Sequence, residues 1–253
     1  MLQSHTTINQ TDLNLKKDMK YMLEEEVKKI KKRYEFRATN ETIKQMWLPF
    51  SEAEIAHRNQ QQIAISKLLR MIGKFDLSGM KILDIGCGTG RILRQCLDYG
   101  ASPENLYGVD IIESRIQKAQ KLSPNIFFDV TDGLAINLKD DDFDIVMQFV
   151  VFSSIYSEKL RQKLADEMIR LLKPGGYIFW WDVHKTVHEE VAELIAPQNF
   201  FPDMAIREIR LGQYPLPSQH ISICKHFKVL GKALDYMFGC KKTHIAALVG
   251  PKK

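Results

Sequence analysis

Hydrophobic and polar residues follow two patterns along the chain. Between apolar stretches, hydrophobic residues recur every three or four positions, as they do on one face of a helix. Short, nearly continuous apolar runs of the kind typical of buried strands occur at residues 80–85, 106–110, 125–130, 143–150 and 177–182. Strands that alternate with helices in this way predict a parallel sheet with helices on both faces.

The segments on either side of this region extend the pattern. Residues 16–33 are rich in charge with one apolar stripe and predict a helix, which is either solvated or a lid over the substrate entrance. After an aromatic-rich link, residues 52–72 predict a second helix that Gly73 ends. We therefore interpret residues 1–75 as an N-terminal helical extension or lid and residues 76–253 as the main domain.

Near the end of the chain, residues 205–211 and 243–249 have the alternation of strands. Between these two strands, the segment at about 213–242 is predicted to be a helical insertion. Its hydrophobic residues recur at helical spacing, and several lysines lie among them. A basic amphipathic helix of this kind suits either weak contact with a membrane surface or packing over an active site.

Composition narrows the class of protein. The chain of 253 residues is 45% hydrophobic and 26% charged, which is typical of a soluble globular protein, and its net charge of +5 is only mildly basic. It has no apolar run long enough to cross a bilayer and no signal-peptide pattern at the N-terminus, so we expect a cytoplasmic protein. Its four cysteines lack the spacing of a zinc site or a disulfide framework: Cys87, Cys96, Cys224 and Cys240.

The strongest motif is a glycine turn that joins the first strand to a helix. Asp84 lies near the end of the strand, and the glycines follow at alternate positions as Gly86, Gly88 and Gly90. Such a turn brings backbone N–H groups up to a ligand. A dinucleotide site would need its third glycine at the position of Arg91, whereas a carboxylate at Asp84 favours a ligand with positive charge.

At this point the chain resembles the class I S-adenosylmethionine-dependent methyltransferases, whose first motif is similar to residues 83–90. Residues 143–146, F-D-I-V, are similar to the fourth motif of that family, and residues 171–176, L-L-K-P-G-G, precede its fifth strand. The resemblance is specific over residues 80–182. It implies a doubly wound α/β fold with a seven-stranded, mostly parallel sheet whose last strand is antiparallel, and S-adenosylmethionine as the cofactor.

The same resemblance implies a set of cofactor-binding residues at four strand ends. Asp110 accepts the ribose hydroxyls, Ile111 packs on the adenine, and Asp132 meets the adenine amino group, with Asp129 as the fallback. The strand end at residues 148–150 lies beside the methionine part. The full predicted set is Asp84, Ile85, Gly86, Cys87, Gly88, Gly90, Asp110, Ile111, Thr131, Asp132, Gly133, Gln148, Phe149 and Val150.

The sequence gives less evidence about the methyl acceptor than about the cofactor. His184, just past the fifth strand, is the best candidate for a general base. His57 and Arg58 either lie on the surface or reach the cofactor's carboxylate or the substrate, and we favour the surface. We interpret the acidic turn at 140–142 as solvated, with metal binding as the alternative. The chain lacks the Asn/Asp-Pro-Pro-Tyr/Phe tetrapeptide of enzymes that methylate adenine or glutamine amino groups, and it has no convincing set of metal ligands. We expect a small-molecule acceptor, such as a sugar, a lipid-linked saccharide or a secondary metabolite. The alternatives are a protein or RNA methyltransferase, or a non-catalytic cofactor-binding protein.

Overall fold

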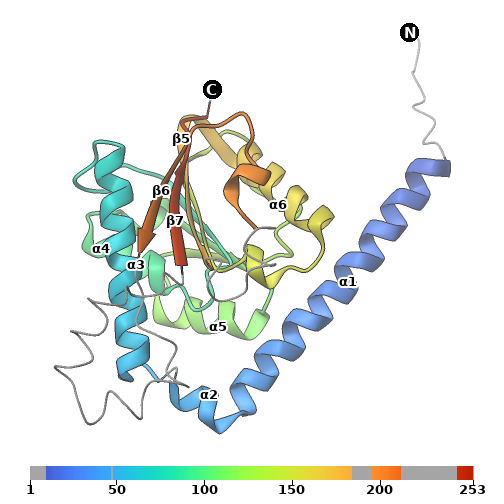
Figure 1. Cartoon of the computed structure of the whole chain (residues 1–253), viewed down its shortest axis with the longest axis horizontal. Coiled ribbons are helices and arrows are strands. Elements are labelled where there is room, and N and C mark those ends of the chain that lie inside the picture. Colours follow the sequence, from blue (N-terminus) through green and yellow to red (C-terminus); the bar gives the residue numbers. More distant parts are fainter. Residues whose placement is uncertain (1–9, 47, 184–194, 212–243, 253) are drawn as a thin grey trace, which may run out of the picture.

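A single seven-stranded sheet forms the centre of the computed structural model, which describes residues 10–46, 48–183, 195–211 and 244–252 (Figure 1). The strand order is β3-β2-β1-β4-β5-β7-β6, and β7 runs antiparallel to both of its neighbours. The predicted fold class is thereby confirmed. The strands are β1 (Ile82–Ile85), β2 (Leu106–Asp110), β3 (Phe127–Val130), β4 (Phe143–Phe149), β5 (Leu172–Val183), β6 (Ile206–Leu211) and β7 (His244–Val249).

The central strand β1 determines where a ligand can bind. Ile82 pairs with Leu106 of β2 on one side and with Ile145 of β4 on the other. The chain runs outward from β1 through β2 to β3 and then returns across β1 to begin β4. Ligands of open α/β sheets bind at the carboxyl ends of the strands where the order reverses in this way. The glycine turn follows β1 at that edge.

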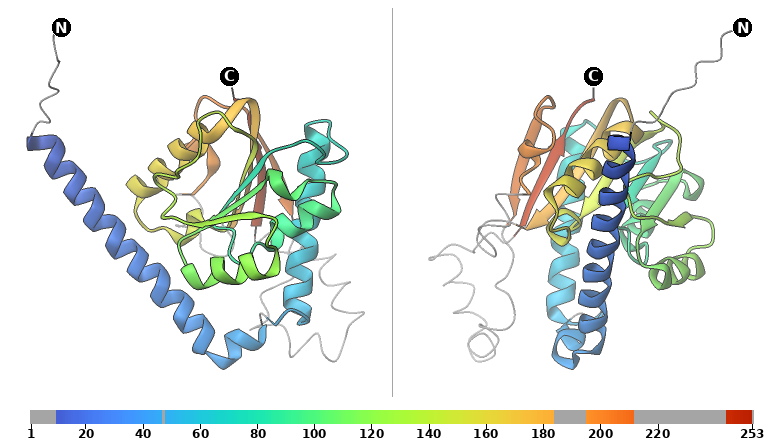
Figure 2. Two further views of the ribbon diagram at one scale, coloured as in Figure 1. Left: turned by 180° about the vertical axis from the view of Figure 1, so that it is seen from behind. Right: turned by 90° about the vertical axis from the view of Figure 1, so that its right-hand side faces the viewer.

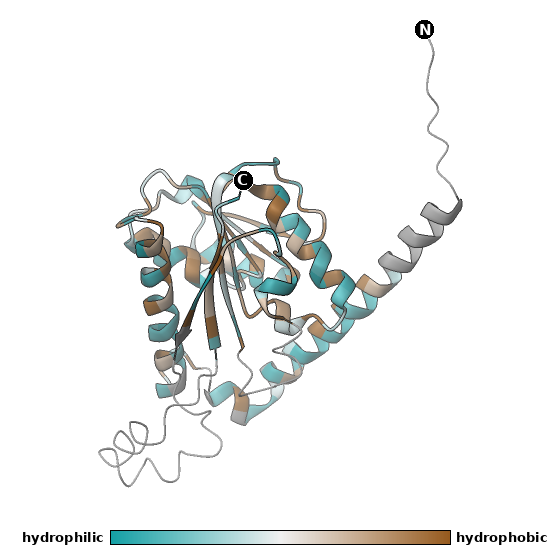
Figure 3. Cartoon of the chain, turned by 45° about the horizontal axis from the view of Figure 1, so that its top comes forward, coloured by the Kyte–Doolittle hydropathy of each residue, from teal (hydrophilic) through white to brown (hydrophobic). Residues whose placement is uncertain are grey.

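Helices cover both faces of the sheet. The helices α3 (Glu52–Met71), α4 (Arg91–Asp98) and α5 (Glu113–Leu122) pack on one face, and α6 (Glu158–Leu171) packs on the other. Figure 3 shows brown apolar segments along the strands and teal polar positions on the outer sides of the helices. The inner strands β1, β2 and β4 are apolar along nearly their whole length because both of their faces are buried, whereas three of the four residues of the edge strand β3 are exposed.

The helix α3 belongs to the body of the domain. Its N-terminus is capped by Ser51, whose hydroxyl oxygen accepts a hydrogen bond of 3.1 Å from the Glu54 N–H. The predicted helix at 52–72 is confirmed, and its side chains Ile55 and Ile63 are 45% and 46% exposed. The buried face is turned away from them and consists of Ala64, Ile65, Leu68 and Leu69.

The first helix, α1 (Gln10–Thr39), is longer than predicted and is followed by α2 (Glu41–Met46). No glycine or proline interrupts residues 34–39, so the helix continues through them and places Tyr34 on α1 and not in a link. Figures 1 and 2 show the N-terminal part of α1 standing apart from the sheet, while its C-terminal part crosses toward α2.

The remaining elements are short. Three of them are single-turn 3-10 helices: η1 (Pro103–Asn105), η2 (Phe152–Ser154) and η3 (Pro197–Asn199). The strand β5 begins earlier than predicted and includes the L-K-P-G-G segment. The predicted insertion at 213–242 lies outside the described residues, as does His184. Among the helices that are described, none has the length and apolar character needed to cross a membrane.

Candidate cofactor and active site

The glycine turn has a backbone shape that side chains rarely allow. Gly86, Gly88 and Gly90 all have positive φ, at 73°, 57° and 75°. A Cβ atom on Gly86 would lie 2.5 Å from Cγ2 of Val151, so glycine is required there for space as well. The backbone N–H groups of residues 86 and 87 both donate to the Val109 carbonyl, at 2.8 and 3.0 Å, which fixes the turn against β2.

Asp110, the last residue of β2, is held rigidly beside this turn. One carboxylate oxygen accepts a hydrogen bond from the Gly88 N–H (2.9 Å), and the other accepts from the Ile112 N–H (2.8 Å). The Arg115 guanidinium lies 4.0 Å away, and the Asp110 residue is only 6% exposed. Each carboxylate oxygen keeps a further lone pair, so the group can also accept the two hydroxyls of a ribose.

A cavity of about 90 Å³ lies at the carboxyl ends of β1, β2 and β4. Nine of the fourteen predicted cofactor residues line it: Ile85, Gly86, Asp110, Ile111, Thr131, Asp132, Gly133, Phe149 and Val150. Asp132 lines the cavity and the fallback Asp129 does not. The other five predicted residues are not among its lining residues: Asp84, Cys87, Gly88, Gly90 and Gln148.

Two of those five carry buried polar atoms that lack a partner. Oδ1 of Asp84 and Nε2 of Gln148 have no hydrogen-bond partner within the described residues, and the two residues are 2% and 0% exposed. Burial raises the pKa of Asp84 to about 8, although the Arg91 charge opposes the shift. Asp84 on β1 therefore has a buried carboxyl oxygen that the ammonium group of a ligand can bind, whereas the Gln148 amide on the neighbouring strand β4 lies against the Asp182 carboxyl group.

Cys87 is unsuited to act as a nucleophile. Its side chain is buried, and burial raises the pKa of the thiol, with the carboxylates of Asp84 and Asp110 adding to the effect. Its Sγ would lie 2.8 Å from a Cβ atom on Gly108, so the side chain fills the space between the turn and β2.

The sequence gives little sign of the cavity walls contributed by α1. Ile30 and Tyr34 line the cavity, and the Arg115 guanidinium lies 3.9 Å from the centroid of the Tyr34 ring. One turn earlier on α1, the buried carboxylate of Glu26 accepts a hydrogen bond from the Tyr156 N–H. The apolar stripe on α1 shows that Ile30 is buried, but nothing in the sequence shows what covers it.

The cavity that Ile30 and Tyr34 help to line is small for a whole cofactor. Pockets for ligands of this size generally measure roughly 300–1,000 Å³, whereas this cavity measures about 90 Å³. The residues around it suit S-adenosylmethionine in kind, with a glycine cradle, a fixed carboxylate and a buried carboxyl oxygen for an ammonium group.

Three aromatic side chains meet farther along the same edge of the sheet. His57 of α3 lies with its ring centroid 5.7 Å from that of His244 and 6.4 Å from that of Trp181, and the His244 and Trp181 rings stack at 5.3 Å. Burial lowers the pKa of both imidazoles, to about 3 for His244, so both are neutral at pH 7. The prediction that His57 lies on the surface is wrong, because it is half-buried against β5 and β7.

His244 was not singled out from the sequence, although a signal for it exists. An antiparallel last strand begins at the edge where the parallel strands end, and His244 accordingly pairs with Val183 at the end of β5. The preceding residue, Asp182, is fully buried, and burial raises its pKa to about 6 despite hydrogen bonds from the Ser153 and Val183 N–H groups. His184, the predicted base, follows β5 outside the described residues.

The acidic turn between β3 and β4 has a structural role. Asp140 pairs with Arg170, Asp141 with Lys252 and Asp142 with Lys81. The turn is therefore ion-paired and not merely solvated. Within the described ranges, no three His, Cys, Asp or Glu side chains are grouped as ligands of a metal ion.

The reversal of strand order between β1 and β4, the glycine turn and the Asp110 carboxylate together define the site of a class I S-adenosylmethionine-dependent methyltransferase fold. Comparison with known proteins agrees, because residues 76–222 match the family described as methyltransferase domain. The chain belongs to that family. The predictions of the class and of S-adenosylmethionine as its cofactor are thereby confirmed.

The relatives differ in what they methylate. The ribosomal protein L11 methyltransferase of Burkholderia lata is 33% identical over 118 residues, which are 47% of this chain and 37% of that protein. Norajmaline N-methyltransferase of Rauvolfia serpentina is 32% identical over 45% of this chain and 40% of its own length. These matches span well under half of either relative. The N-methyltransferase NodS of Bradyrhizobium japonicum, solved with S-adenosyl-L-homocysteine, superposes with a TM-score of 0.55 at 13% identity over 78% of this chain and 88% of its own.

Proposed function

We propose that this chain transfers a methyl group from S-adenosylmethionine to a small-molecule acceptor such as a sugar, a lipid-linked saccharide or a secondary metabolite. The observation that carries the proposal is the position of α1, whose residues Ile30 and Tyr34 form a wall of the cofactor cavity. A helix over the carboxyl edge of the sheet limits the size of the acceptor that can reach the cofactor and keeps water out. We further propose that residues 1–75 are an extension whose α1 supplies this wall and whose α3 completes the core, and that residues 76–253 carry the catalytic site.

Each cofactor residue has a role that follows from its place. Asp110 binds the ribose hydroxyls, Asp132 and Gly133 hold the adenine edge, and Phe149 and Val150 lie beside the methionine part. When bound, the cofactor supplies a methyl group on a sulfonium, which is already a good leaving group. The protein then contributes mainly by positioning the acceptor and excluding water.

A proton must leave the acceptor only when its nucleophilic atom is protonated. We keep His184 as the proposed general base, and the neutral imidazoles of His57 and His244 are the candidates among the described residues. Loss of methyl transfer in His184→Ala with cofactor binding intact would support the first assignment. If methyl transfer is lost in His57→Ala or His244→Ala but not in His184→Ala, the general base belongs to the ring cluster beside Trp181.

Two measurements test the proposal. Calorimetry with S-adenosylmethionine should give heat of binding with the wild type and at least roughly tenfold weaker binding with Asp110→Ala, because hydrogen bonds to a carboxylate contribute about 1.5–3 kcal/mol each. The control is Asp129→Ala, which removes an exposed carboxylate at the end of the next strand. Labelled cofactor is then incubated with the enzyme and separate metabolite, protein and RNA pools, and label in the metabolite pool alone supports a small acceptor.

A protein acceptor is the second candidate, because one relative is named for methylation of ribosomal protein L11. Label that appears in the protein pool would favour it. An RNA acceptor requires label in the RNA pool and binding that weakens steeply with salt. Heat of binding without transfer to any pool would indicate a non-catalytic cofactor-binding protein.

A further inference from the structure

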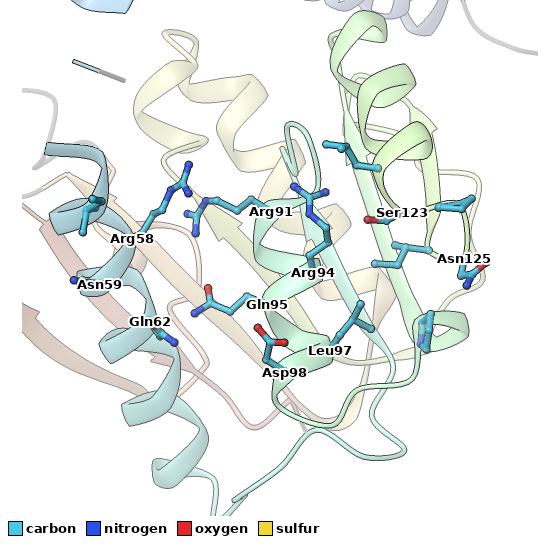
Figure 4. A pocket seen from close by; sticks show the side chains of 15 residues that line it. Arg58, Asn59, Gln62, Arg91, Arg94, Gln95, Leu97, Asp98, Ser123 and Asn125 are labelled. Atoms are coloured by element: carbon cyan, nitrogen blue, oxygen red, sulfur yellow. The ribbon is translucent and has the colours of Figure 1, made fainter. Parts of the chain in front are cut away.

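An open groove of about 820 Å³ lies between α3 and α4 and reaches the segment before β3. It shares no lining residue with the cofactor cavity. Figure 4 shows Arg58 on α3 and Arg91 and Arg94 on α4 at one end of this groove, with Asp98 farther along α4 and Asn125 across it. We call this end the arginine groove.

The arginine groove has more positive than negative charge. Nε of Arg58 donates to the Glu54 carboxylate at 2.7 Å. Arg91 donates instead to the side-chain oxygen of Gln61, and Nη1 of Arg94 donates to the Thr89 carbonyl at 2.6 Å. Within the described residues, no carboxylate accepts a hydrogen bond from either of these two guanidinium groups. Of these three arginines, only Arg58 is therefore directly paired with a carboxylate.

The arrangement brings like charges together in a partly buried place. The guanidinium groups of Arg58 and Arg91 point toward one another (Figure 4). Burial lowers the pKa of Arg91, Glu54 opposes that shift, and the charges of Arg58 and Arg94 add to it. Crowded cations cost free energy unless an anion joins them, and planar guanidinium groups bind phosphate oxygens in pairs.

We propose that the arginine groove is a binding site for a phosphate ester, separate from the cofactor site. S-adenosylmethionine carries no phosphate and belongs to a different cavity, so the groove serves another ligand. The amide side chains of Gln95 and Asn125 line its remainder and suit a ligand with hydroxyl or carbonyl groups. The phosphate belongs either to a free phosphorylated metabolite or to an RNA strand, and both present the same chemistry to the arginines.

Calorimetry on the full chain without cofactor tests this proposal, so its outcome does not depend on methyl transfer. The probes are inorganic phosphate, uridine 5′-monophosphate and a short single-stranded oligouridylate. Arg58→Gln and Arg94→Gln should each weaken binding by about tenfold, as expected for one charge-assisted contact. Arg70→Gln is the matched control, because Arg70 is an exposed arginine on the same helix that does not line the groove.

A second variant acts in the opposite direction and guards against effects on folding. Asp98→Asn removes an exposed negative charge from the groove and should tighten binding by about twofold while leaving the melting temperature unchanged. Binding of the mononucleotide as tight as that of the oligomer identifies a free ester, and much tighter, salt-dependent binding of the oligomer identifies a strand. The proposal is overturned if no probe binds at millimolar concentration, or if Arg70→Gln weakens binding as much as the groove variants.

Discussion

Asp84 is a carboxyl group in a place where a carboxylate is costly. It is almost fully buried, and burial raises its pKa to about 8 against the opposing charge of Arg91. In the unfolded chain the same group ionises near its ordinary pKa of 3.8. Between these two values the folded state holds a proton that the unfolded state has lost.

This difference predicts how stability depends on pH. Because the folded state binds the extra proton, the contribution of Asp84 to stability falls by about 1.4 kcal/mol for each pH unit between about pH 4 and pH 8. Urea unfolding of the wild type and of Asp84→Asn at pH 6 and pH 8 measures it. We expect the wild type to lose about 2 kcal/mol relative to the variant over that interval, and parallel losses would contradict the assignment.

Two glycines with the same backbone angle separate strain from crowding. Gly86 and Gly79 have φ of 73° and 72°, but only Gly86 would place a Cβ atom against a side chain, that of Val151. We expect Gly79→Ala to cost about 1 kcal/mol from strain alone and Gly86→Ala to cost about 2–3 kcal/mol. Thermal unfolding measures both values, and equal losses would show that Val151 moves aside freely.

The sequence predicts individual residues most directly where the backbone demands one residue type. The glycines of the turn and Asp110 were found because a left-handed turn and a strand end restrict what can stand there. The meeting of His57, His244 and Trp181 was not found, because each belongs to a different element and only the packing of α3 over β5 and β7 brings them together.

At the scale of the elements, α1 is held over the cofactor cavity by two attachments. Tyr34 stacks under Arg115, which itself lies beside Asp110, and Glu26 accepts a hydrogen bond from the Tyr156 N–H. The guanidinium of Arg33 lies 4.9 Å from the centroid of the Tyr156 ring. The helix thereby connects the Asp110 end of the cavity to the segment that follows η2.

Weakening one attachment should change how fast the cofactor enters and leaves. Tyr34→Ala removes a cation–π contact of about 1 kcal/mol, which corresponds to roughly a fivefold change in rate. We expect faster association and faster dissociation of the cofactor in stopped-flow measurements. Tyr21→Ala is the control, since Tyr21 is 65% exposed on the same helix. Unchanged rates in Tyr34→Ala would show that α1 does not act as a lid.

The strands were easier to predict than α1 for a physical reason. A parallel strand covered on both faces must be apolar throughout, so β1, β2 and β4 appear directly in the sequence. The limits of α1 and its contacts depend on the surface it meets, and residues 16–33 alone give only a helix with one apolar stripe.

At the scale of the whole molecule, α3 and α1 have different relations to the sheet. Ala64, Ile65 and Leu68 of α3 are each 1% exposed and belong to the core clusters of the strands. The described part of α1 is mostly exposed, with Glu26 and Ile30 as its buried residues. Both helices lie before the proposed boundary near residue 75, so the extension contains one helix that is part of the core and one that is mostly outside it.

Two truncations test that dependence. Removal of residues 1–46 should leave a cooperatively folded domain, because the core clusters of the sheet take their residues from later in the chain. Removal of residues 1–75 exposes the face of the sheet beneath α3 and should abolish the cooperative transition, since each buried leucine or isoleucine contributes about 1.5–3 kcal/mol. Circular dichroism during heating measures both, and a folded 76–253 fragment would contradict the expectation.

The order β5-β7-β6 also has a consequence for synthesis of the chain. On the ribosome, β5 and β6 emerge before β7, with residues 212–243 still to follow. Until β7 arrives, β5 presents an unpaired edge and β6 lacks the strand it pairs with. The nascent protein therefore passes through an interval in which the glycine turn and β1 to β4 can already assemble while the other side of the sheet is open to aggregation or to a chaperone.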